Sequence, residues 1–528
     1  MASRRDELNA YTFAKKRMVA AFLQPSSAAT EEGTPSPLRA VVPGLVTGAL
    51  LLAGFGAWGL LKPTAPKGWD KPRAHVIVGS SSTTRYVILE TDGKPQLHPV
   101  LNLASAKLLL DPGQSSIIRV KDSVLDNGHI TRGPTIGIPY APDRMPSADE
   151  AGKRKRWAVC EQPGGDQANQ TTQKAVFLFA GREADKVEGP QRLHGSQALY
   201  VQGPGENGPR YLVDSAGTKY LLRGPGSAQG RQALDDPRYN LLLRTVFADG
   251  AQPQQVTQDW LDTLNDGSPV EFPVVPGEVG ADAGVPGLGE ANRVGRVLET
   301  RNATAIQHYV VLRGKVQRVS DFVANLLLSS DQLKDLNPGG TPEQVNSAQF
   351  TSDTTGEFYG SARWPREVPR QANSADPAGG DGARDTVCSI LTGVRSDGTT
   401  QVATWAGRDY PAAIVDGATS AYVTPGTGLL YRQFQGTSTG TGLTFLVTDT
   451  GLRYQVQANN DSTSGKSKIG AERKDPGAPE GAQEPVNQAQ ARLGYQDVRP
   501  VPVPVKWSQF LPVGPRLDTN SARRPQGS

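Results

Sequence analysis

Two short motifs match patterns that can carry catalysis. The first, NDSTSGKS at 460–467, ends in the Gly-Lys-Ser of a phosphate-binding loop. Such a loop needs a first glycine, where Asn460 stands, and a following helix whose N-terminus receives the phosphate. The residues that follow, KIGAERKDPGAPEG, are too rich in glycine and proline to open a helix. We therefore expect a solvated polar loop rather than a nucleotide site.

The second motif, GTSTG at 436–440, fits the turn that presents a nucleophilic serine. That turn lies between a strand and a helix, and its serine needs a histidine later in the chain. Here a strand-like LTFLV follows, and no histidine comes after His308. The other histidines are isolated in the sequence: His75, His98, His129 and His194. We therefore expect a hairpin tip, and no catalytic, metal-binding or cofactor-binding residue.

Cys160 and Cys388 are the only cysteines, and neither lies in a metal-ligand spacing. They occupy the same place in two similar stretches, VCEQPGGDQANQTTQKAVFLFAGR and VCSILTGVRSDGTTQVATWAGR. Two copies packed about a pseudo-two-fold axis would bring the cysteines together. This favours a long-range disulfide on the oxidising side of a membrane, and two buried free thiols are the alternative.

The similarity extends to both sides of the cysteines. RYLVDSAGTKYLL at 210–222 matches TFLVTDTGLRYQV at 444–456, and YVILETDGKPQLHPVLNLASAKLLL from Tyr86 matches HYVVLRGKVQRVSDFVANLLL from His308. Short β-branched and aromatic runs broken at glycine predict strands. We expect an internal duplication: four small β-α repeats around a central, disulfide-bearing domain.

Composition supports a loop-rich body, because Gly 59 and Pro 41 accompany only 6% aromatic residues. The expected fold is a single transmembrane helix followed by an elongated α+β, β-rich extracytoplasmic body. The expected segments are an arm and linker at 1–40, the membrane helix at 41–61, a linker at 62–85, repeat 1 at 86–130, the first central part at 131–195, repeat 2 at 196–275, a linker at 276–305, repeat 3 at 306–345, the second central part at 346–420, repeat 4 at 421–518 and a tail at 519–528.

The membrane helix is predicted by VVPGLVTGALLLAGFGAWGLL at 41–61, which has no charged residue. At 1.5 Å per residue this stretch spans about 30 Å, the thickness of the hydrocarbon core. It begins too late and is too long for a cleaved signal peptide. Gly44 and Gly48 have the small-xxx-small spacing that lets another helix approach closely, although glycine is also merely tolerated in such helices.

The arm before this helix, RRDELNAYTFAKKRMVAAFL, reads as a basic amphipathic helix. It suits either the anionic cytoplasmic surface or a cytoplasmic partner. Lysines and arginines at 62–73 locally favour the opposite orientation, but the cysteine pair and the charge at 4–17 place the N-terminus inside. The net charge of +4 is spread along the chain, so we expect no nucleic acid partner.

Several stretches together resemble the EccB family, core membrane components of actinobacterial ESX (type VII) secretion systems. They are YTFAKKRM in the arm, the single apolar span, HPVLNLASAKLLL at 98–110, WAVC at 157–160 and FLPVGPRL near the C-terminus. In the corresponding place of the other half, DTLNDGSPVEF lacks the LPxGP form. The resemblance covers nearly the whole chain.

The resemblance implies an oligomeric complex in the cell membrane with an EccC-type FtsK/SpoIIIE ATPase, EccD, EccE and a mycosin protease. It points to Tyr11, Phe13, Arg17 and Met18 of the arm as partner-docking residues. The leading interpretation is a structural scaffold subunit of a protein-export channel. A membrane-tethered cell-wall-binding protein is one alternative, and an ATPase, as some family labels suggest, is another.

Overall fold

The computed structural model describes residues 4–23, 38–61, 65–114, 116–164, 171–224, 236–302, 305–374, 384–414, 420–457, 469 and 487–526. The chain forms two compact units, Met1–Thr64 and Ala65–Ser528. Each unit is described by itself, and the second is called the body.

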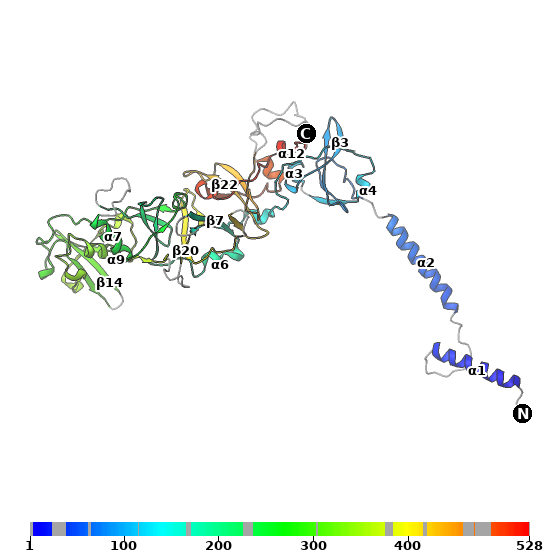
Figure 1. Ribbon diagram of the computed structural model, residues 1–528, viewed down its shortest axis with the longest axis horizontal. Helices are drawn as coiled ribbons and strands as arrows, with labels where there is room; N and C mark the ends of the chain where they lie inside the picture. The colour runs from blue at the N-terminus through cyan, green and yellow to red at the C-terminus, as the bar shows by residue number, and fades with distance from the viewer. Residues whose placement is uncertain are drawn as a thin grey trace. The chain divides into compact units, whose positions relative to one another are not determined.

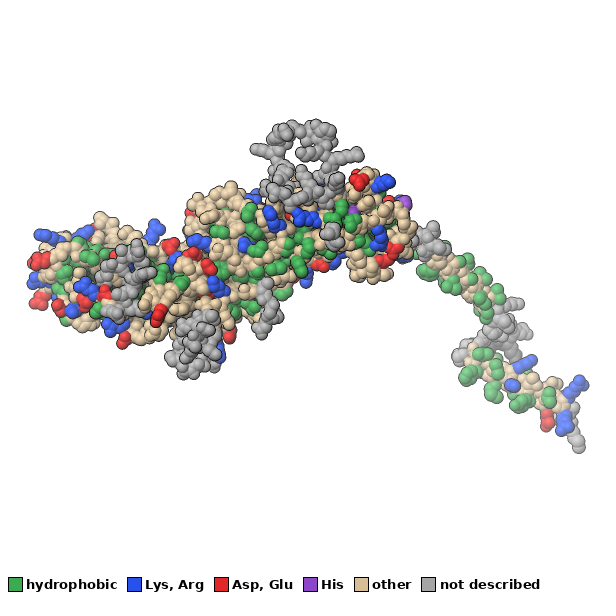
Figure 2. Space-filling view, turned by 45° about the horizontal axis from the view of Figure 1, so that its top comes forward, with side chains coloured by type: hydrophobic (Ala, Val, Ile, Leu, Met, Phe, Trp, Pro, Cys, Tyr) green, Lys and Arg blue, Asp and Glu red, His purple; other side chains and the backbone are tan. Residues whose placement is uncertain are grey.

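The first unit consists of two helices, α1 (Arg4–Leu23) and α2 (Leu38–Leu61) (Figure 1). Within α2, the stretch Ala40–Trp58 is long and apolar enough to cross a membrane. Green apolar side chains follow its exposed surface in Figure 2. Pro43 lies inside the helix, and the Thr47 hydroxyl donates a hydrogen bond of 2.7 Å to the Pro43 carbonyl. The helix begins three residues before the predicted span and otherwise agrees with it.

The body contains four sheets built on one plan, an antiparallel three-stranded meander with short parallel strands or bridges at its edges. Sheet 1 has the order β4-β1-β2-β3-β5, and sheet 2 has the order β11-β8-β9-β10-β12. Sheet 3 has the order β16-β13-β14-β15-β17. Sheet 4 has the order β24-β23-β22-β25, and two parallel bridges, Arg453 with Val513 and Val456 with Leu517, take the place of a fifth strand beside β24.

The strands have the following bounds. Sheet 1 comprises β1 (Val76–Gly79), β2 (Arg85–Thr91), β3 (Lys94–Pro99), β4 (Ile117–Val120) and β5 (Thr131–Arg132). Sheet 2 comprises β8 (Gln197–Gln202), β9 (Arg210–Val213), β10 (Thr218–Leu221), β11 (Gln254–Gln255) and β12 (Asn265–Asp266), with β18 (Arg370–Gln371) also paired to β8. Sheet 3 comprises β13 (Val297–Arg301), β14 (Ile306–Leu312), β15 (Lys315–Val319), β16 (Glu343–Gln344) and β17 (Ser352–Glu357). Sheet 4 comprises β22 (Leu429–Phe434), β23 (Leu443–Val447), β24 (Arg453–Gln455) and β25 (Val501–Pro504).

A fifth sheet, called the central sheet, combines strands from both halves of the chain. It contains β6 (Arg156–Gly164), β7 (Thr171–Phe179), β19 (Thr386–Val394), β20 (Thr400–Gly407) and β21 (Ala421–Val423) in the order β20-β19-β6-β7-β21. Two hairpins, one from each half, thus meet where β6 pairs antiparallel with β19. Because their inner strands pair antiparallel, the two hairpins are related by a local two-fold rotation.

Helices join the four outer sheets in two pairs. In the first, called the 1–4 pair, α3 (Leu103–Leu108), which follows β3 of sheet 1, packs on α10 (Gln488–Arg492) and α12 (Thr519–Ala522), which follow strands of sheet 4. In the second, called the 2–3 pair, α7 (Pro237–Phe247), which follows β10 of sheet 2, packs on α9 (Asp321–Ser329), which follows β15 of sheet 3. The remaining short α-helices are α4 (Asp122–Leu125), α5 (Ala148–Gly152), α6 (Asp185–Glu188), α8 (Gln258–Leu261) and α11 (Val505–Ser508).

Local sequence explains where the longer helices start. The Asp236 carboxylate accepts from the Arg238 backbone N–H at the start of α7, and Pro237 takes the first helical position. The Ser320 hydroxyl caps α9 by accepting from Val323 N–H. In α3, the Asn102 side chain caps by accepting from Ser105 N–H. Each cap satisfies a backbone donor that the helix leaves without an intrahelical partner.

The sheets do not follow all the segment boundaries expected from the sequence. β1 lies in the segment 62–85 expected as a linker, and β13 lies in the linker expected at 276–305. β17 and β18 extend the outer sheets although 346–420 was assigned to the central part, and β21 pairs with β7 although it begins the expected repeat 4. β1 and β13 are the first strands of local antiparallel meanders, which the expected boundaries cut off. β17, β18 and β21 pair in parallel with strands far away in the chain, so short-range sequence patterns do not reveal them.

Candidate functional site

The centre of the body, called the junction, is where the two halves of the chain meet. Cys160 on β6 lies opposite Cys388 on β19, with the two Cα atoms 4.0 Å apart, and the sulfurs form a disulfide. Both cysteines are fully buried. The bond therefore links residues 228 positions apart across two neighbouring strands of one sheet.

On the disulfide's face, the central sheet carries small and aromatic side chains. Phe177 and Phe179 stack on β7, and Tyr422 on β21 lies tilted against both rings. Ala158 and Ala175 share this buried cluster with the cysteines. The small residues leave room for the aromatic rings, and the disulfide lies in an apolar cluster. Such a setting suits an inert structural disulfide better than a reactive thiol pair.

A buried carboxylate holds sheet 2 against the junction. Glu161, next to Cys160, is fully buried and accepts from the backbone N–H of Thr257 at 2.8 Å and from its hydroxyl. Burial raises the pKa of Glu161 above its usual range, and the two Thr257 hydrogen bonds oppose this shift. Thr257 in turn caps α8, whose Trp260 indole donates to the Val159 carbonyl at 3.1 Å.

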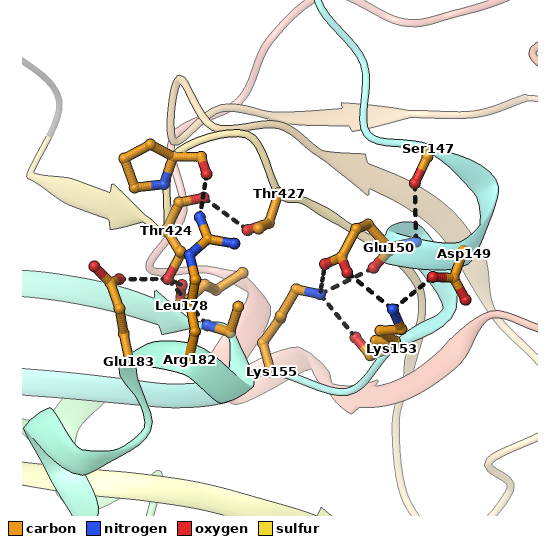
Figure 3. A network of polar contacts seen from close by, with 12 residues as sticks. Ser147, Asp149, Glu150, Lys153, Lys155, Leu178, Arg182, Glu183, Thr424 and Thr427 are labelled. Carbon is orange, nitrogen blue, oxygen red and sulfur yellow. Dashed lines mark hydrogen bonds and ion pairs between the residues drawn. The ribbon is translucent and has the colours of Figure 1, made fainter.

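Polar contacts also cross between the halves beside β7 (Figure 3). Glu183 accepts hydrogen bonds from the hydroxyls of Thr424 at 2.6 Å and Tyr422 at 3.0 Å, and Arg182 donates to the Pro425 carbonyl. Burial alone would raise the pKa of Glu183, but the donated hydrogen bonds hold it below its usual value. These contacts tie residues of the first half to residues more than 200 positions later.

A buried lysine lies next to this group in Figure 3. The Lys155 ammonium donates to the Glu150 carbonyl at 2.9 Å, the Glu150 carboxylate at 3.3 Å and the Lys153 carbonyl at 3.2 Å. Its side chain is only 1% exposed, and burial lowers the pKa of Lys155. All three ammonium protons have acceptors, so this lysine fixes the entry into β6.

The arm residues and membrane glycines singled out from the sequence lie in the first unit. Tyr11, Phe13 and Met18 of α1 are each more than two-thirds exposed. Apolar and charged side chains are only weakly segregated on this helix, because Lys15 falls within the face of Tyr11 and Met18, and Phe13 lies on another face. On α2, a Cβ added at Gly44 or Gly48 meets no other atom of this chain within 4 Å.

The structure describes only one of the two candidate catalytic motifs. GTSTG is the turn between β22 and β23, with Ser438 exposed, which agrees with the expected hairpin tip. The GKS motif lies outside the described residues. Within the described ranges no group of three or more His, Cys, Asp or Glu side chains is arranged to hold a metal ion. The sequence reasoning missed Glu161, Lys155 and Glu183, because their roles depend on partners far away in the chain.

Comparison with known proteins identifies the family. Residues 1–527 match the family model described as "Type VII secretion system ESX-1, transport TM domain B" (EccB). This chain belongs to that family. The EccB resemblance found in the sequence is therefore confirmed.

Two curated relatives illustrate the similarity. The chain is 25% identical over 552 residues to "ESX-3 secretion system ATPase EccB3" of Mycobacterium tuberculosis (strain H37Rv), covering 98% of this chain and 88% of that protein. It is 28% identical over 307 residues to "ESX-1 secretion system ATPase EccB1" of Mycolicibacterium smegmatis (strain MKD8), covering 58% of this chain and 57% of that relative.

Solved structures share the fold. A chain of an intact ESX-5 inner membrane complex superposes with a TM-score of 0.56 at 20% identity, covering 100% of this chain and 96% of that chain. The EccB3 dimer from the ESX-3 core complex gives a TM-score of 0.54 at 22% identity, covering 85% and 99%. The proteins similar to this chain are thus components of ESX membrane complexes.

Proposed function

We propose that this chain is a structural scaffold subunit of a type VII secretion membrane complex, anchored by α2 with its N-terminus in the cytoplasm and its body outside. The observation that carries the proposal is the fully buried Cys160–Cys388 disulfide at the junction. A buried, inert crosslink between two halves of a chain serves rigidity rather than turnover. Disulfides persist in oxidising compartments, and this supports a body outside the cytoplasm.

We further propose that the body arose by internal duplication into four repeats. The shared strand plan of sheets 1 to 4 and the two-fold relation of the central hairpins support this history. In this duplication, sheet 1 of the first half corresponds to sheet 3 of the second half, and sheet 2 corresponds to sheet 4. The 1–4 pair is therefore the counterpart of the 2–3 pair. A scaffold of repeated modules offers several separate surfaces for other subunits.

The proposed partners are an EccC-type FtsK/SpoIIIE ATPase, EccD, EccE and a mycosin protease. Contacts inside the membrane would use the face of Gly44 and Gly48, where another helix can approach closely. Contacts on the cytoplasmic side would use Tyr11, Phe13, Arg17 and Met18. Because lysine interrupts the apolar face of α1, a protein partner suits this helix better than a lipid surface alone.

The deciding experiment is affinity purification of the full-length chain from native membranes. We expect EccC and EccD to co-purify in fixed ratio, and Gly44→Leu with Gly48→Leu to lower their yield while the variant stays in the membrane. The matched control is Leu45→Ala with Leu52→Ala, which changes the same helix without blocking close approach. Recovery of cell-wall polymer without these subunits would favour the tethered wall-binding alternative.

Both curated relatives are named as ATPases, and this motivates a second test. We propose no catalytic role, because Asn460 stands where a phosphate-binding loop has its first glycine, and the glycine- and proline-rich sequence after the GKS motif at 465–467 does not favour the helix that such a loop requires. Lys466→Ala should leave export unchanged. Loss of export at a normal protein level, together with loss of ATP turnover by the purified chain, would establish the enzyme instead.

A further inference from the structure

The 2–3 pair contains a cavity at the place that α12 occupies in the 1–4 pair. The cavity, of about 280 Å³, opens between the start of α7, the end of α9 and the segment 271–274. Its lining includes Arg223, Arg238, Leu242, Phe272, Val274 and Asp331. The volume is at the small end of ligand sites, so it suits a short chain end rather than a folded domain.

The wall segment of this cavity has a direct counterpart in the 1–4 pair. Val270 pairs with Leu222 directly after β10, and Leu517 pairs with Val456 directly after β24. By this register, the segment 271–274 corresponds to 518–521. In the 1–4 pair the corresponding residues form α12, where Thr519 and Ala522 are buried against α3.

The C-terminal segment therefore fills the 1–4 pair. After α12, Pro525 forms a bridge with Ile136, and the Gln526 side chain donates to the Gly137 carbonyl at 2.8 Å. Buried Arg492 of α10 also donates to the Leu110 carbonyl after α3. In the 2–3 pair, by contrast, Val274 is 63% exposed and its backbone N–H is held by the Tyr359 hydroxyl at 2.9 Å.

The charged residues that line the cavity differ in whether they have an ion-pair partner. Arg223 is paired with Glu271 at 3.0 Å, and Asp331 lies 3.7 Å from Lys334. Among the described residues the guanidinium of Arg238 has no hydrogen-bond or ion-pair partner, and it lines the cavity together with the apolar side chains of Phe272 and Val274. An unpaired cation next to an apolar floor matches a carboxylate next to an aliphatic side chain.

We propose that this cavity binds the C-terminal end of another polypeptide. Its terminal carboxylate pairs with Arg238, and its last, aliphatic side chain packs on Phe272 and Val274. The Asp331 carboxylate is placed to accept from the ligand's backbone N–H groups. A peptide end from another chain thus takes the place that the chain's own C-terminal segment takes in the 1–4 pair.

The test uses the purified full-length chain in detergent and the probe N-acetyl-Ala-Leu, which has a free terminal carboxylate, in isothermal titration. Arg238→Gln should weaken binding by up to about fivefold, the effect of one exposed ion pair. The analogue of the probe with a C-terminal amide, which lacks the carboxylate, should bind the wild-type chain more weakly by the same factor. Val274→Arg, which fills the apolar floor, should weaken binding at least tenfold.

The matched control is Val513→Arg, because Val513 is 66% exposed and is not among the residues that line the cavity. It should bind the probe like the wild type. Absence of binding at millimolar probe, equal binding of acid and amide, or unchanged binding by Val274→Arg would each overturn the proposal. Binding that appears only after replacing 225–235 with a Gly-Ser segment of equal length would identify that segment as the occupant and would also overturn it.

Discussion

The 1–4 pair and the 2–3 pair share a strand plan but differ in how their helices meet. In the 2–3 pair, α7 and α9 contribute large aliphatic and aromatic side chains, among them Leu242, Val246, Phe322 and Leu326, all nearly fully buried. In the 1–4 pair, by contrast, the helices contribute small side chains to the core, and Ala104 and Ala106 of α3 and Ala489 of α10 are fully buried in one cluster. Small residues bring helices close together but bury little apolar area.

In the 1–4 pair, buried polar contacts and the helix α12 compensate for the smaller buried apolar area. Arg492 and Gln490 are buried, and the Tyr495 hydroxyl donates to the Pro146 carbonyl at 2.7 Å. α12 then covers α3. The comparison teaches that an aliphatic helix pair is self-sufficient and can leave an open cavity, whereas an alanine-rich pair depends on buried hydrogen bonds and on an added segment.

The largest effect is expected for the disulfide, which belongs to neither pair and should support both. Replacing both Cys160 and Cys388 with Ala removes a crosslink across 228 residues, worth about 5 kcal/mol by the chain-entropy relation. Thermal unfolding of the full chain should shift to lower temperature, and hydrogen exchange should quicken in both pairs alike. Faster exchange confined to the 1–4 pair would contradict a shared dependence on the junction.

The next effect separates the two pairs directly. Arg492→Met should cost about 2–3 kcal/mol, because it leaves the buried Leu110 carbonyl without its charged donor. The control in the 2–3 pair, Arg238→Met, should change stability by less than about 0.5 kcal/mol, since this side chain is exposed. Hydrogen exchange rates of the α3 amides report the loss of stability in the 1–4 pair, and those of the α9 amides report the loss in the 2–3 pair. Equal protection of α3 in wild type and Arg492→Met would show that the alanine-rich pair needs no polar support.

Much of this molecule follows from short-range patterns in its sequence. The membrane helix, the meanders and the Cys160–Cys388 pairing could be predicted, because apolar length, turn glycines and repeated spacing are local signals. The edge strands β5, β12 and β16 could not, since each is two residues long and pairs with a strand far away. The cavity was equally hidden, because its walls come from four separated segments and none carries a motif.

A smaller effect concerns acid stability and should affect sheet 1 of the 1–4 pair. His98 is fully buried, with its Nδ1 3.0 Å from the Pro134 carbonyl and its Nε2 without a partner. Burial lowers the pKa of His98 below 6.5, the hydrogen bond to Pro134 opposing this. The folded state therefore favours neutral imidazole, and stability should fall as pH drops below about 6.5, by up to about 1.4 kcal/mol per pH unit until the folded-state pKa is reached.

His98→Gln is the control for that prediction, because its amide can keep a donor toward Pro134 but does not titrate. Limited proteolysis and hydrogen exchange of sheet 1 at pH 5 and pH 7.5 provide the measurement. The wild type should lose protection at pH 5 relative to the variant, while sheet 3 should respond equally in both. An identical pH dependence of sheet 1 in wild type and His98→Gln would exclude this histidine as the cause.

The smallest effect is expected for a hydrogen bond between the two helices that occurs at equivalent positions in the two pairs. In the 2–3 pair, the Asn325 side chain on α9 donates to the Thr245 carbonyl on α7 at 3.0 Å, and Asn325→Ala should cost about 1 kcal/mol. In the 1–4 pair, the Lys107 ammonium on α3 reaches the Leu493 carbonyl, just past α10, only at 3.4 Å, and burial lowers the pKa of Lys107. Because the cost of burying this charge offsets a long hydrogen bond, Lys107→Met should change stability by less than about 0.5 kcal/mol. Local hydrogen exchange of α7 and α10 reads out the two variants, and a larger loss for Lys107→Met would mean that the 1–4 pair depends on this ammonium as well as on Arg492.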